Sequence, residues 1–159
     1  MAKKQTSQVH LGGSVLDRSR HVCAFFHSKD EEYNVLLPFI AEGIKAGDKA
    51  CHIVESGHRP EHRRRLGEGG INTAKAERGG QLDILAWEDA YLQDGHFNQH
   101  RMLALIEKLL IKGKTEGYPI TRLVANMEWA LEDRPGVADL VEYETRLNYV
   151  LPKYDDAVV

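Results

Sequence analysis

The stretch that decides the fold is HVCAFF, residues 21–26, followed by the turn HSKDEE, residues 27–32. The apolar run predicts a buried β-strand, and the amphipathic pattern of residues 31–46 predicts a helix after it. In α/β proteins that hydrolyse nucleotides, such a turn carries GxxxxGK[ST], whose backbone amides hold phosphates. This turn has no glycine and contains three acidic residues, which would repel a triphosphate. The sequence therefore predicts binding or sensing rather than nucleotide hydrolysis.

The composition is typical of one soluble globular domain. The chain has 159 residues and a net charge of −3, so nothing in its charge favours nucleic acid or an anionic membrane as a direct partner. No apolar run approaches the roughly 20 residues that cross a bilayer, and the N-terminus lacks the apolar region of a secretory signal. Cys23 and Cys51 both lie in apolar runs, where cysteine behaves as a small reduced hydrophobic residue. We therefore expect a cytoplasmic protein.

Strand and helix patterns alternate along the chain. We expect strands at residues 21–27, 49–55, 81–87 and 121–127, and helices at about 31–46, 60–67, 98–114 and 135–151. A weakly structured segment is expected at 69–80. Strands that alternate with helices pair in parallel through right-handed crossovers, so the expected fold class is α/β, a three-layer sandwich with a mainly parallel sheet.

The two ends of the chain complete the expected organisation. Residues 1–20 are polar and glycine-containing, and we expect them to form an arm or a short edge element. Residues 21–159 form the domain itself. Residues 157–159 look like the beginning of a fifth strand that is cut short, which suggests a module of a larger signalling protein.

Several motifs, taken together and in order, resemble one family of sensory domains. They are HVCAFF at 21–26, LPFIAEG at 37–43, YLQDGHF at 91–97, NMEWAL at 126–131 and EYE at 142–144, with Asn148 and Leu151-Pro152. This set resembles the MEDS domain, the methanogen/methylotroph, DcmR-type sensory domain. The resemblance covers about residue 21 to the C-terminus.

The resemblance implies a RecA- or KaiC-like fold without a working phosphate loop. It also implies an input module that is attached to histidine kinases, DNA-binding regulators or anti-sigma-type proteins, and that binds small hydrocarbon derivatives. The sequence carries no recognisable output domain. A fragment and a free-standing sensor therefore both remain open.

The expected ligand site lies at the carboxyl ends of the strands, where open parallel sheets bind their ligands. Aromatic and acidic residues gather at these ends, which favours a mostly apolar pocket for a small organic molecule. The predicted ligand-binding residues are Phe26, His27, Tyr33, Glu55, Trp87, Tyr91, Glu128 and Trp129. Alternatively, the aromatic residues cap the core and the acidic ones are solvated. Glu128 stands where a RecA-like ATPase carries a metal-associated acid, but without a phosphate loop that role loses its main support.

Glu144 and Asn148 lie one turn apart on the apolar stripe of the last expected helix. Polar groups on a buried stripe need partners. These two residues either fasten the helix to a loop or belong to a ligand-linked polar network. We predict that they couple ligand binding to the signal.

No catalytic or metal-binding motif stands out. The sequence contains neither GxSxG nor HExxH, and an enzyme would need Glu55 or Glu128 as a general base with a raised pKa. His58 and His62 are four residues apart, but Pro60 lies between them and no cysteine pair accompanies them. We therefore expect no enzyme activity, no cofactor and no metal site.

The leading functional hypothesis is a non-enzymatic sensory domain. It would bind a small organic ligand and signal to a fused or separate output domain of the kinase, DNA-binding or anti-sigma type. Two alternatives stay open: a degenerate nucleotide-binding domain of the ATPase type, and a ligand-free module for homodimerisation or scaffolding.

Overall fold

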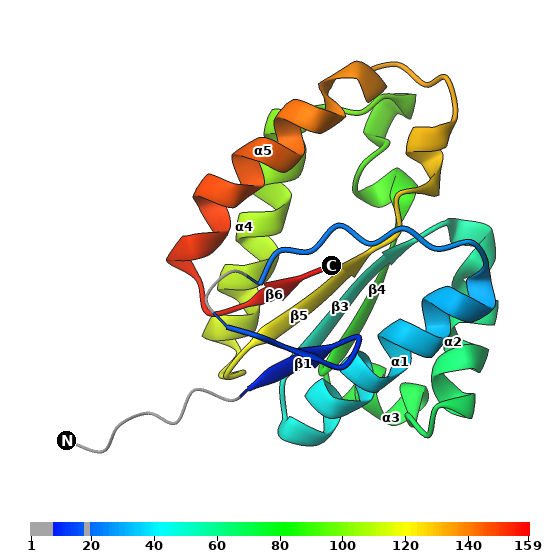
Figure 1. Ribbon diagram of the computed structural model, residues 1–159, viewed down its shortest axis with the longest axis vertical. Coiled ribbons are helices and arrows are strands. Elements are labelled where there is room, and N and C mark those ends of the chain that lie inside the picture. Colours follow the sequence, from blue (N-terminus) through cyan, green and yellow to red (C-terminus); the bar gives the residue numbers. More distant parts are fainter. Residues whose placement is uncertain (1–7, 18–19) are drawn as a thin grey trace.

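The computed structural model describes residues 8–17 and 20–159 (Figure 1). Its strands are β1 Val9–Leu11, β2 Ser14–Leu16, β3 Lys49–Val54, β4 Leu82–Ala86, β5 Thr121–Ala125 and β6 Ala157–Val158. Its α-helices are α1 Lys29–Ala46, α2 Arg59–Glu68, α3 Thr73–Arg78, α4 Gln99–Thr115 and α5 Leu140–Val150. Across these two described stretches, none of the helices has the length and apolar character that a membrane crossing requires.

The main sheet has four parallel strands in the order β4-β3-β5-β6. The two central strands are in register, so that Ile53 of β3 lies between Leu85 of β4 and Ala125 of β5. Helices α1, α2 and α3 cover one face, and α4 and α5 cover the other (Figure 1). The α/β class with a parallel sheet between helices is confirmed. The finer prediction of a RecA- or KaiC-like arrangement stays a prediction.

Alternation of side chains along the strands divides the core into two layers. Cys51, Ile53 and Leu123 face α4 and α5, whereas Ala50 and Val124 belong to the layer beneath α1. Successive residues of a strand point to opposite faces, and strands that are buried on both faces read as continuous apolar runs. This is why β3 and β5 were recognisable in the sequence.

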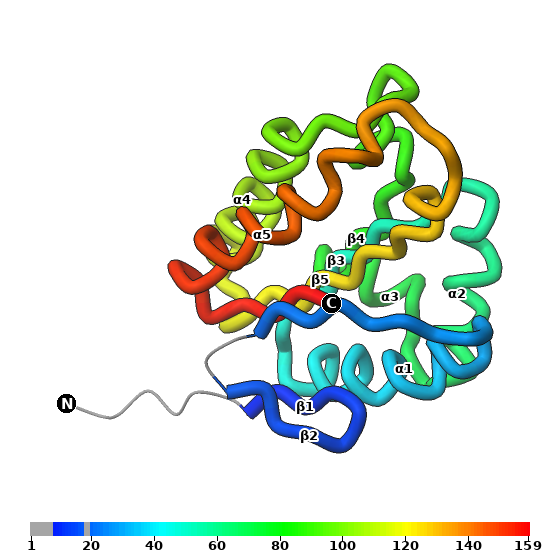
Figure 2. Tube along the Cα trace, turned by 45° about the horizontal axis from the view of Figure 1, so that its top comes forward, coloured from blue at the N-terminus to red at the C-terminus, as the bar shows by residue number. Residues whose placement is uncertain are grey.

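The expected strand at 21–27 is wrong. Only His21 forms a bridge, to Val158 of β6, and the backbone N–H of Val22 donates to the Val158 carbonyl at 2.9 Å. Because β6 is two residues long, the apolar run soon has no strand to pair with and leaves the sheet. Phe25 is 93% exposed. We call residues 20–28 the strap, because they cross the carboxyl ends of the strands on their way to α1 (Figures 1 and 2).

Two other expected elements differ from the structure. The last helix begins at Leu140 and not at Pro135, because Gly136 adopts a left-handed φ of 88°. A side chain at Gly136 would also collide with the carbonyl of Phe97. The segment 69–80, expected to be weakly structured, contains α3, whose first turn is capped by the Asn72 side chain.

The N-terminal residues form a hairpin that is separate from the main sheet. β1 and β2 pair antiparallel, and the turn between them uses Gly12 and Gly13 at φ values of 57° and 80°, as a tight two-residue hairpin turn requires. Val9 is fully buried in the layer beneath α1. The predicted edge element is therefore a hairpin on α1, and residues 1–7 and 18–19 of the expected arm lie outside the described residues.

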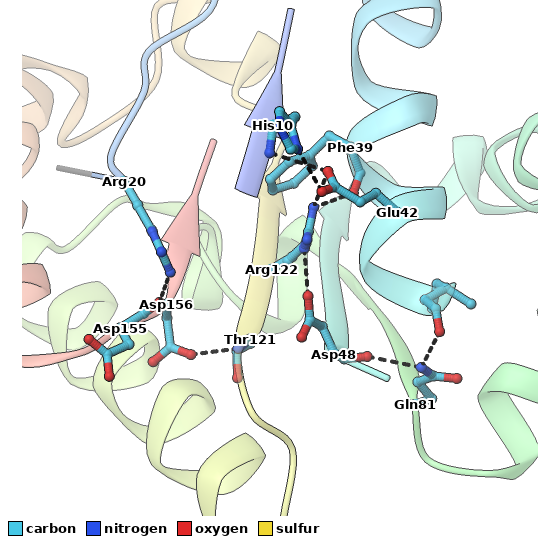
Figure 3. Close-up of polar contacts among 11 residues, drawn as sticks. His10, Arg20, Phe39, Glu42, Asp48, Gln81, Thr121, Arg122, Asp155 and Asp156 are labelled. Carbon is cyan, nitrogen blue, oxygen red and sulfur yellow. Dashed lines mark hydrogen bonds and ion pairs between the residues drawn. The ribbon is translucent and has the colours of Figure 1, made fainter. Parts of the chain in front are cut away.

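A buried polar network joins α1 to the amino ends of β3 and β5 (Figure 3). The Arg122 guanidinium donates to the Asp48 carboxylate at 2.8 Å, to the Phe39 carbonyl at 2.8 Å and to the Glu42 carboxylate at 3.2 Å. Gly43 makes room for this side chain, since an added Cβ would lie 2.5 Å from Arg122 Cδ. The network lies at the edge opposite the strap, and it fixes the helix to the sheet on which the site is built.

Candidate functional site

A cavity of about 460 Å³ lies between the strap and the carboxyl edge of β5 and β6. The strap forms one wall, β5 with residues 126–128, 130 and 131 forms a second, and α5 forms a third. Helix α1 contributes Lys29, Glu32 and Leu36, and α4 contributes Ile106. The surface between these walls is mainly apolar; it includes Phe26, Leu123, Met127, Leu140, Leu147 and Val158. The cavity thus lies where parallel sheets bind their ligands, outside the carboxyl ends of the strands.

A first polar cluster holds the beginning of the strap against α5. His21 Nε2 lies 3.1 Å from Glu144 Oε2, and His21 Nδ1 lies 3.0 Å from Asn148 Oδ1. The Cys23 thiol donates to Glu144 Oε2 at 3.5 Å. The hydrogen bond to Glu144 raises the pKa of His21 despite its burial. Burial, together with the Glu144 charge, raises the pKa of the Cys23 thiol.

A second polar cluster holds the end of the strap. Lys29 Nζ lies 2.8 Å from Glu128 Oε1 and 3.0 Å from Glu32 Oε2. Burial acts to lower the pKa of Lys29, but the hydrogen bonds to Glu128 and Glu32 outweigh it and raise that pKa. The cavity therefore has an apolar middle and a charged group of residues at each end of the strap.

Side chains of the chain itself cap the N-terminus of α1. Ser28 Oγ accepts from the backbone N–H of Glu31 at 3.2 Å, and the Glu31 carboxylate accepts from the backbone N–H of His27 at 2.7 Å. This arrangement is a variant of the capping box, in which the glutamate accepts from the residue before the N-cap instead of from the N-cap itself. Three acidic residues stand in the first helical turn. An anion that approached this helix end would meet the carboxylates of Asp30, Glu31 and Glu32, which oppose its binding.

The structure brings half of the predicted ligand-binding residues to the cavity. Phe26, His27, Tyr91 and Glu128 line it, and so does Glu144. Phe26 and His27 do so from the strap, although the strand that was expected to carry them is absent. Their predicted role in ligand binding remains a prediction.

The other four predicted residues lie outside the cavity. Trp129 is fully buried, and its ring centroid lies 5.1 Å from those of Tyr91 and Phe97. The buried Trp87 donates from Nε1 to the Asn126 carbonyl at 2.8 Å. A short turn after β5 directs Trp129 into the core layer beneath α4 and α5, so this residue caps the core, as the alternative interpretation held.

Tyr33 and Glu55 bond to histidines instead of facing the cavity. Tyr33 Oη lies 2.7 Å from His62 Nδ1, and Glu55 lies 2.9 Å from His58. His62 is buried and bonds on its other side to His52 Nδ1 at 2.8 Å. His58 and His62 thus have different partners and do not meet at a common site.

Sequence reasoning missed His21, Cys23, Lys29 and Asn126, all of which line the cavity. Cys23 was expected to behave as a small hydrophobic residue of a strand. The structure instead exposes it, because the strap leaves the sheet. One signal was available: residues two apart in an extended segment point to the same side, so His21 and Cys23 had to face a common neighbour.

Glu144 and Asn148 were expected either to fasten the last helix to a loop or to form a ligand-linked network. The first arrangement is present, since both side chains contact His21 of the strap. Glu144 also lines the cavity. Their predicted role in signalling stays a prediction.

Comparison with known proteins places the whole site within one family. The MEDS family model, described as MEthanogen/methylotroph, DcmR Sensory domain, matches residues 20–159. The chain is also 28% identical over 149 residues to the transcriptional repressor DcmR of Methylorubrum extorquens, strain DSM 6343 / CIP 106787 / DM4. That match covers 93% of this chain and 53% of the repressor, so the chain spans about half the length of this relative. No solved structure matches the chain. The protein belongs to the MEDS family of sensory domains.

Proposed function

We propose that the protein is a non-enzymatic, cytosolic sensory domain that binds a small organic molecule in the cavity beneath the strap. The carrying observation is the cavity itself, about 460 Å³ with mainly apolar walls. Sites for small molecules typically measure roughly 300–1,000 Å³ and combine apolar walls with a few polar groups. Membership of a sensory family supports the regulatory role.

The walls indicate the chemistry of the ligand. An apolar middle between Phe26, Leu123 and Met127 suits a hydrocarbon portion. The charged groups at the strap ends, His21 with Glu144 and Lys29 with Glu128, suit one polar substituent. A small hydrocarbon derivative satisfies both requirements.

The strap and α5 would carry the signal. A ligand shifts a conformational equilibrium only if it binds two states with different affinity. Both elements line the cavity, and Glu144 and Asn148 join them through His21. Filling the cavity would change how α5 is held against the strap. Because the relative is a transcriptional repressor, we propose an output that regulates transcription through a fused or separate domain.

A ligand screen with matched variants tests this proposal. Native mass spectrometry identifies any co-purified small molecule, and thermal unfolding is then measured with a panel of small hydrocarbon derivatives. Ala130 lines the cavity, so Ala130→Phe should fill part of it and abolish the stabilisation by ligand. Ala104→Phe introduces the same ring on the exposed side of α4 and should leave that stabilisation unchanged. Equal responses in the two variants would refute binding in this cavity.

Hydrogen exchange tests the route of the signal. Glu144→Gln keeps the shape of the side chain but removes its charge, so it should alter the ligand-induced change more than ligand affinity. Exchange of residues 20–28 and 137–151 is measured with and without ligand. Identical protection in both states would show that α5 only supports the cavity.

The nucleotide-binding alternative has less support. The side chains of Ser28 and Glu31 cap the helix end that would hold phosphates, and Glu32 and Glu128 stand nearby around Lys29. We expect no calorimetric signal for ATP with magnesium. Micromolar, magnesium-dependent binding would favour a degenerate nucleotide-binding domain instead.

The dimerisation alternative rests on exposed apolar side chains of the strap, of the turn after β5 and of α5, namely Phe25, Leu131, Val141 and Tyr149. Sedimentation analysis of the wild type and of Val141→Ser distinguishes it. A dimer that dissociates in this variant and gives no response to any ligand would favour the scaffolding function.

A further inference from the structure

Three side chains at the beginning of the strap bring metal-binding atoms together. The imidazole of His21, the thiol of Cys23 and the carboxylate of Glu144 each offer one donor atom, and these atoms all lie within 4.8 Å of one another. Glu144 Oε2 is 3.1 Å from His21 Nε2 and 3.5 Å from Cys23 Sγ. His21 and Cys23 approach from an extended segment, and Glu144 approaches from a helix.

The two separations from Glu144 are close to those between ligands of a tetrahedral zinc site. Zinc binds sulfur at about 2.3 Å, nitrogen at about 2.1 Å and oxygen at about 2.0 Å, so neighbouring ligands in a tetrahedron lie about 3.3–3.6 Å apart. Both donor separations fall within a few tenths of an ångström of that range. Thiolate, imidazole and carboxylate together suit a borderline-soft divalent ion. We propose that His21, Cys23 and Glu144 bind one Zn²⁺ ion.

Asn148 provides the support that a metal-binding histidine needs. A ligating imidazole usually bonds through its other ring nitrogen to an oxygen acceptor, which fixes the ring and leaves the first nitrogen for the metal. Asn148 Oδ1 lies 3.0 Å from His21 Nδ1, so Nδ1–H donates to it and Nε2 faces Glu144 and Cys23. Asn148 is thus a positioning residue of the site.

Three protein ligands would leave the fourth position of a tetrahedral Zn²⁺ ion open for another molecule. Three protein ligands and an open fourth position are the arrangement of zinc sites that bind water or a substrate. The three residues border both the main cavity and an adjoining surface groove on α5. The side chain of His21 is 9% exposed and that of Glu144 is 22% exposed, so the ion has access from solvent.

The zinc site does not depend on the proposed organic ligand. Metal binding is measured on the protein alone, without a histidine tag and with no organic molecule present. Failure to bind Zn²⁺ would leave the ligand screen unaffected, and failure of the ligand screen would leave the metal titration unaffected. The two proposals are therefore distinguishable.

Cobalt and zinc titrations test the site directly. We expect one Co²⁺ per chain, with the absorption band of a cobalt–thiolate bond, and displacement of Co²⁺ by Zn²⁺. Cys23→Ser should abolish the band. Asn148→Ala should keep the band but weaken Zn²⁺ affinity roughly 10- to 100-fold, as loss of a supporting group does. His27→Gln is the matched control, because His27 also lines the cavity but lies outside the cluster, and its affinity should equal that of the wild type.

A chemical readout on the wild type removes any dependence on variants that fold poorly. Cys23 is exposed and Cys51 is buried, so iodoacetamide should modify Cys23 first, and Zn²⁺ should protect it. Absence of the cobalt–thiolate band, no protection of Cys23 by Zn²⁺, or an equal loss of affinity in His27→Gln would each overturn the proposal.

Discussion

Replacement of Trp129 by alanine separates a core role from a ligand-binding role. The Trp129 side chain is fully buried, and its indole lies against the rings of Tyr91 and Phe97, which in turn contact Tyr143. Removal of a buried tryptophan costs about 3–5 kcal/mol of unfolding free energy. For a domain of this size, each kcal/mol lowers the melting temperature by about 2–4 °C, so we expect a decrease of about 6–20 °C.

Trp129→Phe is the matched control for this substitution. It keeps an aromatic ring against Tyr91 and Phe97, and it removes the indole N–H, which has no hydrogen-bond partner among the described residues. An unpaired buried donor is itself unfavourable by about 1–3 kcal/mol, so this variant should lose much less stability than Trp129→Ala. Urea unfolding followed by circular dichroism measures both. A loss below about 1 kcal/mol for Trp129→Ala, together with a loss of ligand binding, would refute the core assignment.

Three further predictions concern the core and the buried polar groups. Burial lowers the pKa of His52 well below 6.5 and that of His62 to about 4. On acidification these histidines therefore bind protons at a higher pH in the unfolded chain than in the folded protein. The unfolding free energy should therefore decrease as the pH is lowered from 6.5 to 4, by roughly 3 kcal/mol for His62 alone. In urea titrations at several pH values, His62→Gln should make this decrease smaller. Arg122→Met leaves the Asp48 carboxylate buried without its guanidinium partner and should lower the unfolding free energy by about 3–5 kcal/mol. Adding Asp48→Asn removes the unpaired charge, so the double variant should recover part of this loss. Gly113→Ala should cost about 1–3 kcal/mol in the same assay, because the added Cβ would lie 2.2 Å from a threonine hydroxyl on β5.

The sequence predicted those helices and strands whose formation depends on residues close together in the chain. β3 and β5 were recognisable because strands that are buried on both faces are apolar throughout. α1 was recognisable from its spacing and from Gly47, which ends the helix at a left-handed φ of 84°. α4 was recognisable from its apolar stripe, and the structure adds that the Asn98 side chain caps its first turn.

The strap could not be predicted because its conformation depends on a distant partner. HVCAFF at 21–26 has the composition of a buried strand, but a strand needs a neighbour along its whole length. The neighbour here is β6, at the other end of the chain, and it has only two residues. Local propensity yields to tertiary context in such cases.

The cavity lies where the sequence predicted a site, and four of the eight predicted residues line it, while their role in ligand binding stays a prediction. The general rule for parallel sheets gave the carboxyl edge, and Phe26, Tyr91 and Glu128 line the cavity there. The rule does not say which way a side chain points after a strand ends, so Trp129 was placed at the edge although it turns into the core. His21 does not stand out in the sequence, because it begins an apolar run that predicts a strand.

The anchoring of the strap has a kinetic consequence. Its beginning is held by His21 on α5 and its end by Lys29 on Glu128, while Phe25 between them stands 93% exposed. A molecule that leaves the cavity past the middle of the strap need not break either anchor. Phe25 itself lines the cavity, so under the proposed function a substitution there would alter the rate of ligand exchange more than the affinity, to which the buried walls contribute most. The speed of the response would thus depend on the middle of the strap, and the affinity mainly on the walls that β5 and α5 provide.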